Sequence, residues 1–357
     1  MTIPIFSSTQ EDYASAMAAK LGRGYRHALK LYSDWFQLGK VSSEASWIEP
    51  QARALVEEMI QITDFSLPVK SHEKQEGDLI KFLLEFHDGL QSESVMIPMQ
   101  FGTTLCISSQ VGCRMGCAFC ETGKMGLLRN LTAAEIVSQV FCARHIYGKP
   151  VRNIVFMGMG EPLDNFEAVM QSVKILTCPA GMAFGPSRIT ISTSGVVDHI
   201  YRLMEEADPA LNLAVSVNAP NDEIRSRIMP VNKKWDMADL KKAMVDYCAH
   251  PRREILAEYV LIQDVNDSLS SADELAEYLQ GLKVKVNLIP YNPQSRDRFA
   301  PPSSEVKEAF LSRMREKGYQ TLLRGTKGQK IMAACGQLGN KEQRKKLLQI
   351  GKTGSFL

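Results

Sequence analysis

Three cysteines in one short loop carry the clearest chemical signal in the sequence. Cys113, Cys117 and Cys120 follow the spacing C-x3-C-x2-C in a glycine-containing segment. Three thiolates on one loop can bind three corners of a 4Fe-4S cluster, because soft sulfur ligands suit iron, and the fourth iron then keeps an open position. The alternative is a structural zinc site, which requires four protein ligands. No histidine lies between His87 and His145, and no second cysteine pair follows at zinc-finger spacing.

An iron with an open position needs a further ligand, and a second motif suggests one. The segment Gly158-Met159-Gly160-Glu161-Pro162 follows an expected strand. Its glycines allow close approach of the backbone, and its carboxylate can accept hydrogen bonds from an ammonium group. This combination suits the amino-acid end of S-adenosylmethionine (SAM). An ordinary glycine-rich turn between a strand and a helix is the alternative.

The elements that must position these motifs alternate between strands and helices, which predicts βα units and a parallel sheet. The expected strands cover residues 103–108, 152–158, 188–194, 212–218, 254–262 and 284–290. The expected helices cover residues 132–147, 165–176, 197–206, 237–250, 271–280 and 304–317, the first with a capping box of Thr132 and Glu135. Six such units predict an α/β fold with an incomplete (β/α)6 TIM-like barrel, whose chemistry belongs at the C-terminal ends of the strands.

The N-terminal region differs from the barrel pattern. Residues 9–64 show apolar positions at helical spacing, and residues 78–86 and 92–98 read as a β-hairpin. We therefore expect an N-terminal helical and hairpin domain (1–98), a partial barrel (99–325) and a C-terminal segment (326–357). Arg23, Arg26 and Lys30 recur at helical spacing and are expected to share one basic face.

Composition excludes several classes of protein. The chain has 357 residues, of which 45% are hydrophobic and 23% charged, and this balance excludes a disordered, collagen-like or coiled-coil chain. No apolar run approaches the ~18 residues of a membrane span, and the N-terminus lacks a signal-peptide pattern. We expect a cytoplasmic protein without membrane association, in which the eight cysteines do not form a disulfide framework.

The C-terminal tail is basic, although the formal net charge of the whole chain is only +2. It contains Lys341, Arg344, Lys345 and Lys346. A run of this kind is usually a solvated helix face, but it also supplies what contact with RNA phosphates requires.

Four ordered motifs resemble one family within the radical SAM superfamily. They read TLCISSQVGC (104–113), FMGMGEP (156–162), VNLIPYNP (286–293) and AACGQL (333–338). In these segments the chain is similar to the RlmN/Cfr family of RNA adenine methyltransferases. The resemblance covers about residues 90–340, with a weaker similarity in the N-terminal helices.

This resemblance implies a radical route for methylating adenine. In the family, a reduced 4Fe-4S cluster cleaves SAM to a 5'-deoxyadenosyl radical, and a cysteine carries the methyl group, so two SAM molecules are used per turnover. By motif position Cys335 carries the methyl group, Cys106 resolves the adduct through a transient disulfide, and Glu93 removes the ring proton. From the residues alone, Cys335 could instead be a small buried residue, Cys106 could face the core and Glu93 could face solvent.

The resemblance also implies a set of SAM contacts. The residues that match the family's contact positions are Gly160, Glu161, Ser192, Ser216, Val217, Asn218 and Asn292. Two segments depart from the family pattern. The chain has Ser-Val-Asn at 216–218 where the family usually has Ser-Leu-His, and Gly328 to Met332 lacks the acidic residues that the family usually has before Cys335.

The expected function is therefore methylation of carbon 2 of adenosine in 23S ribosomal RNA, with transfer RNA next to the anticodon as a second candidate substrate. The alternatives are methylation of carbon 8, as in the Cfr branch, and a non-catalytic iron-sulfur RNA-binding protein. The expected partners are the RNA and an electron-donor protein such as flavodoxin or ferredoxin, with the enzyme acting as a monomer.

Overall fold

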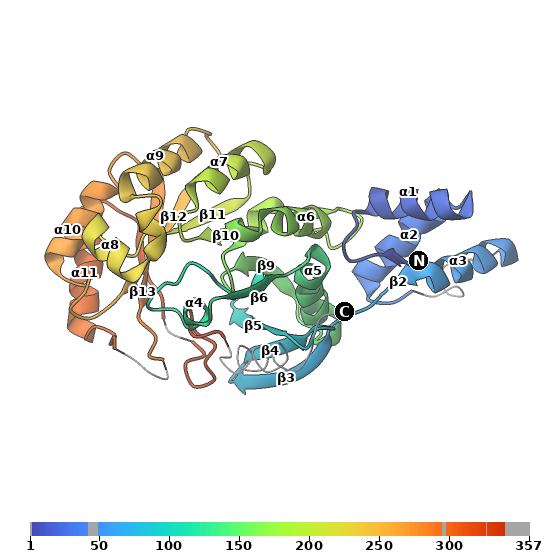
Figure 1. The fold of residues 1–357 in the computed structure, drawn as a ribbon, viewed down its shortest axis with the longest axis horizontal. Coiled ribbons are helices and arrows are strands. Elements are labelled where there is room, and N and C mark those ends of the chain that lie inside the picture. The colour runs from blue at the N-terminus through green and yellow to red at the C-terminus, as the bar shows by residue number, and fades with distance from the viewer. Residues whose placement is uncertain (1, 42–48, 295–297, 326, 340–357) are drawn as a thin grey trace, which may run out of the picture.

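One large sheet organises the protein. The computed structural model describes residues 2–41, 49–294, 298–325 and 327–339 (Figure 1). In this part of the chain, ten strands form a sheet in the order β14-β13-β12-β11-β10-β9-β6-β5-β4-β3. Neighbouring strands from β6 to β14 run parallel, and β3, β4, β5 and β6 are joined by antiparallel pairs. The sheet strands are β3 (Val69–Glu76), β4 (Leu79–Glu85), β5 (Gln91–Met99), β6 (Gly102–Cys106), β9 (Val151–Phe156), β10 (Ile189–Thr193), β11 (Asn212–Ser216), β12 (Ile255–Leu261), β13 (Val284–Pro290) and β14 (Thr321–Leu323).

Helices follow the parallel strands, as an incomplete barrel of βα units requires. The expected fold class is confirmed, and all six expected strands and helices are present. The helices are α5 (Ala133–Phe141, continued by a π-helical turn at Cys142–Ile146), α6 (Phe166–Thr177), α7 (Val197–Glu206), α8 (Asp222–Ile228), α9 (Met237–Cys248), α10 (Leu269–Tyr278) and α11 (Ser304–Glu316), with 3-10 turns at Pro162–Asn165, Pro186–Arg188 and Pro230–Lys233. The capping box of Thr132 and Glu135 begins α5 as expected.

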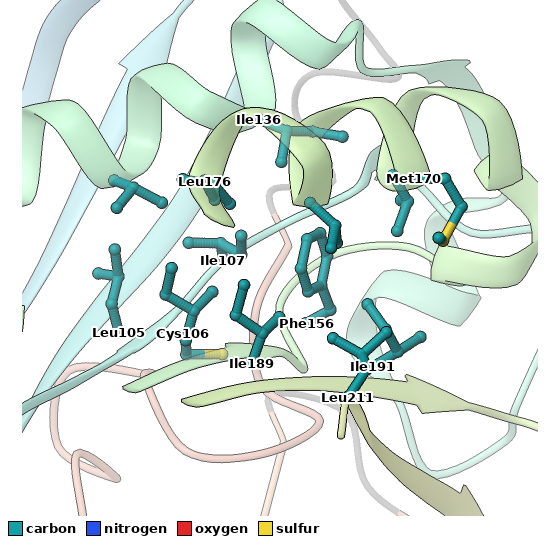
Figure 2. Packing of buried hydrophobic residues seen from close by; sticks show 14 of the residues in the cluster. Leu105, Cys106, Ile107, Ile136, Phe156, Met170, Leu176, Ile189, Ile191 and Leu211 are labelled. Atoms are coloured by element: carbon teal, nitrogen blue, oxygen red, sulfur yellow. The ribbon is translucent and has the colours of Figure 1, made fainter. Parts of the chain in front are cut away.

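The core lies between the sheet and these helices. Leu213 and Val215 on β11 and Leu288 on β13 are fully buried. Strands of this kind are covered on both faces and therefore consist mostly of apolar residues. Figure 2 shows Leu105 and Ile107 with Ile136, Leu176 and Phe156 in this layer.

The hairpin is not separate from the barrel, which corrects the expected boundary at residue 98. Strand β5 pairs with β6, so that Val95 lies opposite Cys106, and β4 and β3 extend the sheet further. The hairpin turn itself lies where it was expected. The sequence does not predict this continuity. The local pattern identifies a hairpin, but it does not show which strand of another sheet the hairpin pairs with. Strands β3 and β14 were also not expected from the sequence.

The N-terminal helices form a lobe at the end of the molecule away from α10 and α11 (Figure 1). They are α1 (Gln10–Leu21), α2 (Tyr25–Leu38) and α3 (Pro50–Ile62), accompanied by the short pair β1 (Ile3–Pro4) and β2 (Thr63–Asp64). Arg23 lies in the connection between α1 and α2 rather than on a helix, and Lys30 forms an ion pair with Asp34 at 2.9 Å. The expectation is therefore wrong for Arg23, because the helix is interrupted at Gly22 and Gly24, whereas Arg26 and Lys30 lie four residues apart on α2.

An aromatic cluster joins this lobe to the barrel. The Phe141 ring lies 5.1 Å from Phe6, 4.9 Å from Trp35 and 6.3 Å from Phe36 between ring centroids. Phe141 itself is 2% exposed. Aromatic pairs at such distances add to the free energy of burial.

The described chain contains no helix that is both long and apolar enough to cross a lipid bilayer.

Removing the central ring of this cluster should destabilise the protein. Phe141→Ala is expected to lower the free energy of unfolding by about 3–5 kcal/mol, because it leaves a cavity between lobe and barrel. Denaturant unfolding measures this change. The control is Ile146→Ala, at a side chain that is 53% exposed, which should change stability by no more than about 0.5 kcal/mol. Equal effects of the two variants would contradict the packing described here.

Candidate active site

The cysteine loop lies between two short elements that follow the first barrel strand. Strand β7 (Gln110–Gly112) pairs with β8 (Leu127–Asn130), and helix α4 (Glu121–Met125) begins directly after Cys120. The Cys113 amide donates to the carbonyl of Gly126 at 3.1 Å, and the Cys120 amide donates to that of Cys117 at 3.1 Å. The second bond makes a turn between Cys117 and Cys120, the first joins the two ends of the loop, and all three cysteines line the same cavity.

The ends of the barrel strands complete this cavity, as expected for an α/β barrel. The sequence-predicted residues that line it are Cys113, Cys117, Cys120, Gly160, Glu161, Ser192, Ser216, Asn218, Asn292 and Cys335. Val217 is fully buried and does not line the cavity. Cys106 and Glu93 also lie outside its lining. Glu93 accepts a hydrogen bond from Gly339 in the segment that carries Cys335, and Cys106 lies near Cys335 itself.

The cavity fits a polar ligand. The hydroxyl of Ser194 and one carboxylate oxygen of Glu258 are buried without a hydrogen-bond partner in the described structure, and both residues line the cavity. Buried polar atoms of this kind require a partner from elsewhere. Gly160 has a φ of 103°, and a Cβ there would lie 2.6 Å from that of Gln110, so only glycine permits this close approach.

The donor set suits an iron-sulfur cluster. Cys113, Cys117 and Cys120 supply three sulfur ligands to one cavity. In a cluster, each cysteine binds its own iron, so the sulfurs need not converge. Burial raises the pKa of the Cys117 and Cys120 thiols, and binding to iron would deprotonate them.

Glu161 is held by the backbone. Its two carboxylate oxygens accept hydrogen bonds from the amides of Ser194 at 2.7 Å and Leu163 at 3.1 Å. Burial raises the pKa of this carboxyl group, while the bond from Ser194 lowers it. These bonds orient the carboxylate within the lining, where it can still accept from an ammonium group.

Arg225 fixes the loops that follow two neighbouring strands, although the sequence did not single it out. Its side chain is fully buried on α8. It donates to the carbonyls of Ser194 at 2.7 Å, Ser216 at 3.1 Å and Val217 at 3.1 Å. In the sequence, Arg225 is one of several charged residues in a short segment. Such a residue cannot be told apart from one that is exposed to solvent.

Cys335 is exposed and lies in the cavity, so the interpretation as a small core residue is wrong. Its carbonyl accepts a hydrogen bond from Asn292 Nδ2 at 3.0 Å. The next carbonyl, of Gly336, accepts from the amide of Glu121 at 2.8 Å, and Thr122 Oγ1 donates to Leu338 at 2.5 Å. The Cys335 segment is thus bound directly to the helix that follows the cysteine loop.

Cys106 is buried in the core layer and also lies near Cys335. Burial, and then the nearby Cys335 thiol, raise the pKa of Cys106 to about 12. Leu105 and Ile107 point to the opposite side of the strand, which Figure 2 shows together with the Cys106 sulfur. Cys106 and Cys335 are both free thiols in this structure.

Glu93 is buried, which excludes the solvent-facing interpretation. It is 3% exposed and forms an ion pair with Lys81 at 3.0 Å. Lys81 was not predicted as part of the site, although a single lysine in the apolar strand β4 is a usable signal.

Asn218, where the chain departs from the family pattern, contacts a neighbouring strand. Asn218 has a φ of 57°, a left-handed conformation that asparagine tolerates better than most residues. Its Oδ1 accepts from the amide of Val260 at 2.8 Å, and its Nδ2 lies 3.3 Å from Met229 Sδ. The amide therefore ties two strand ends together while it lines the cavity.

Comparison with known proteins agrees with this geometry. The family model of the radical SAM superfamily matches residues 107–276. The chain is 54% identical over 344 residues to a probable dual-specificity RNA methyltransferase RlmN 1 of Protochlamydia amoebophila, with 96% of each chain covered. It is 36% identical to a dual-specificity RNA methyltransferase RlmN of Bdellovibrio bacteriovorus, over 98% of this chain and 87% of the relative. A crystal structure of a radical SAM methyltransferase from Sphaerobacter thermophilus has a TM-score of 0.86 at 39% identity, covering 94% of this chain and 98% of the other.

Cys106 and Cys335 should differ sharply in their reactivity towards alkylating reagents. A thiol with a pKa of about 12 is almost entirely protonated at pH 8, with a thiolate fraction on the order of 10⁻⁴, so Cys106 in reduced, cluster-free protein should resist iodoacetamide. Its labelling should rise with pH, whereas exposed Cys335 should already be labelled at pH 8. Peptide mass spectrometry measures both. Unfolded protein is the control, in which both cysteines should react; equal labelling in the folded protein would contradict the buried position of Cys106.

Proposed function

This chain belongs to the radical SAM superfamily and, within it, to the RlmN family of RNA methyltransferases, and we propose that it methylates carbon 2 of adenosine in RNA. As a radical SAM enzyme it uses a 4Fe-4S cluster and SAM. The proposed substrates are 23S ribosomal RNA and transfer RNA next to the anticodon. The printed names of its relatives, which call them dual-specificity RNA methyltransferases, support an RNA substrate.

The observation that carries the proposal is the position of Cys335. This exposed thiol shares a cavity with the three cysteines of the loop and lies near a second thiol, Cys106. Carbon 2 of adenine is electron-poor and does not attack the methyl group of SAM as a nitrogen would. A thiol that first accepts the methyl group provides the carrier that a radical route requires.

The proposed function assigns the residues of the cavity to two tasks, binding the cluster and binding SAM. Cys113, Cys117 and Cys120 would hold the cluster, which when bound would supply the electron that cleaves SAM. Gly160 and Glu161 would contact the amino-acid end of SAM. The remaining proposed SAM contacts are Ser192, Ser216, Val217, Asn218 and Asn292; Val217, which is buried outside the lining, would act through its backbone.

Cys335 would accept the methyl group of one SAM molecule, so that a second is consumed in each turnover. Loss of one hydrogen atom from the Cys335 methyl group to the 5'-deoxyadenosyl radical would let that carbon bond to carbon 2 of the base. The adduct would return one electron to the cluster, and Glu93 would take the proton from carbon 2. Cys106 would then attack the Cys335 sulfur to form a disulfide; the bond between this sulfur and the transferred carbon would break, its electron pair would leave with the carbon, and a proton would complete the methyl group of the product. The disulfide must be reduced before the next turnover. The position of Cys106 near Cys335, and the hydrogen bond between Glu93 and Gly339 in the Cys335 segment, support these roles.

The RNA and the reductant place further demands on the protein. The target adenine must leave its stack to reach the cavity, which costs least in single-stranded or looped RNA. We propose that residues 1–98 contribute to RNA binding and that an electron-donor protein such as flavodoxin or ferredoxin reduces the monomeric enzyme. The basic residues at 341–346, a further candidate for phosphate contacts, lie outside the described residues.

Single cysteine variants test the proposal. Cys335→Ala should abolish methyl transfer, because the methyl group loses its carrier. Cys106→Ala should still load Cys335 but should leave RNA covalently attached to the protein, because the disulfide cannot form. The measurements are nucleoside mass spectrometry of digested RNA and denaturing gel electrophoresis, with Cys248→Ala as a control that keeps activity.

The same nucleoside analysis separates the alternatives. The proposal predicts 2-methyladenosine, whereas 8-methyladenosine would move the reaction to carbon 8. Methyl transfer that persists in Cys335→Ala would exclude the cysteine-carrier mechanism. RNA binding without any methylation by the reconstituted wild-type protein would support a non-catalytic iron-sulfur protein instead.

A further inference from the structure

A buried ion pair lies outside the cavity, between the hairpin strands. Lys81 Nζ lies 3.0 Å from Glu93 Oε2, and the two residues are 5% and 3% exposed. Lys81 is opposite Val95 in the β4–β5 register, so Glu93 is its diagonal neighbour on the same face. Removing two charges from water is unfavourable unless further hydrogen bonds satisfy them. The other hydrogen-bond partners of Lys81 and Glu93 therefore indicate which part of the protein the ion pair stabilises.

Both members of the pair bind the segment that carries Cys335. Lys81 Nζ donates to the carbonyl of Met332 at 2.9 Å. Glu93 Oε1 accepts from the amide of Gly339 at 3.4 Å. Since Met332 and Gly339 lie on either side of Cys335 in the chain, one ion pair holds the segment at both ends.

The backbone at Met332 adds an independent observation. Met332 has a φ of 54°, a left-handed conformation that is unfavourable for a side chain of this size. Such conformations persist only where the surroundings hold them. The hydrogen bond from Lys81 is made to the carbonyl of this same residue.

We propose that Lys81 is a positioning residue that fixes the Glu93 carboxylate and the Cys335 segment in one arrangement. This inference rests on the proposed function, in which Glu93 takes a proton from the base bound to Cys335. An ammonium group has three donors and a compact charge, so it can bind a carboxylate and a carbonyl at once. Without Lys81, Glu93 would be a buried charge lacking its cation, and Met332 would lose the bond that holds its carbonyl.

The test uses full-length, reconstituted protein with Lys81→Met, Lys81→Arg and a matched control. Lys74 is the control position, because it lies directly opposite Lys81 on β3 but is exposed. The first measurement is amide hydrogen exchange of peptides covering 328–339, without RNA. Lys81→Met should exchange faster in these peptides, whereas Lys74→Met should match the wild type.

The second measurement is the ratio of methylated RNA to 5'-deoxyadenosine formed. If Lys81 positions the reacting groups, SAM cleavage continues in Lys81→Met while the ratio falls by up to about a hundredfold, as small misplacements of catalytic groups do. Lys81→Arg, which keeps the cation, should restore part of the ratio. A merely stabilising pair would lower both products together and leave the ratio unchanged.

Wild-type exchange and a wild-type ratio in Lys81→Met would overturn the inference. If Lys81→Met does not fold, Lys81→Gln, which keeps a donor but not the charge, replaces it in both measurements. Failure of the proposed function is distinguishable, because the wild type would then make no methylated RNA. The exchange measurement would still decide whether Lys81 holds the Cys335 segment.

Discussion

The site depends on contact between two segments that are far apart in the chain. The amide of Glu121 donates to the carbonyl of Gly336 at 2.8 Å, and Thr122 Oγ1 donates to that of Leu338 at 2.5 Å. These bonds join the helix after the cysteine loop to the residues after Cys335. Together with the bond from Asn292 to the Cys335 carbonyl, they fix the thiol that the proposal makes a methyl carrier relative to the three cysteines. The parallel sheet makes the contact possible, because it brings the strand ends and their loops to one edge.

Buried polar groups, rather than loops alone, hold the cavity in shape. Arg225 binds carbonyls after β10 and β11, Asn218 joins β11 to β12, and the Lys81–Glu93 pair holds the C-terminal segment against the hairpin. Each such group is unfavourable to bury unless its hydrogen bonds are made. Because these hydrogen bonds are all made only in this arrangement of the loops, they favour it over others. The apolar core between the sheet and the helices offsets the unfavourable free energy of burying the polar groups.

Much of the barrel could be predicted from the sequence, because alternating strands and helices leave a periodic pattern. The strand 284–290 and the helix 197–206 were predicted to the residue. The three cysteines and Glu161 carry signals of residue type and spacing, and all four line one cavity. The position of the hairpin in the barrel sheet depends on long-range pairing, which leaves no local pattern. Arg225 and Lys81 were not predicted as site residues, because a charged residue is expected to be exposed unless buried partners are known, and the sequence does not show such partners.

The central claim is that the three cysteines bind a 4Fe-4S cluster with one iron open to SAM. Electron paramagnetic resonance of anaerobically reconstituted, reduced protein, with and without SAM, tests it most directly when combined with assay of 5'-deoxyadenosine. The account predicts about four irons per chain, a cluster signal that changes when SAM binds, and cleavage of SAM. A protein that takes up only zinc, or a reduced cluster that neither responds to SAM nor cleaves it, would contradict the account.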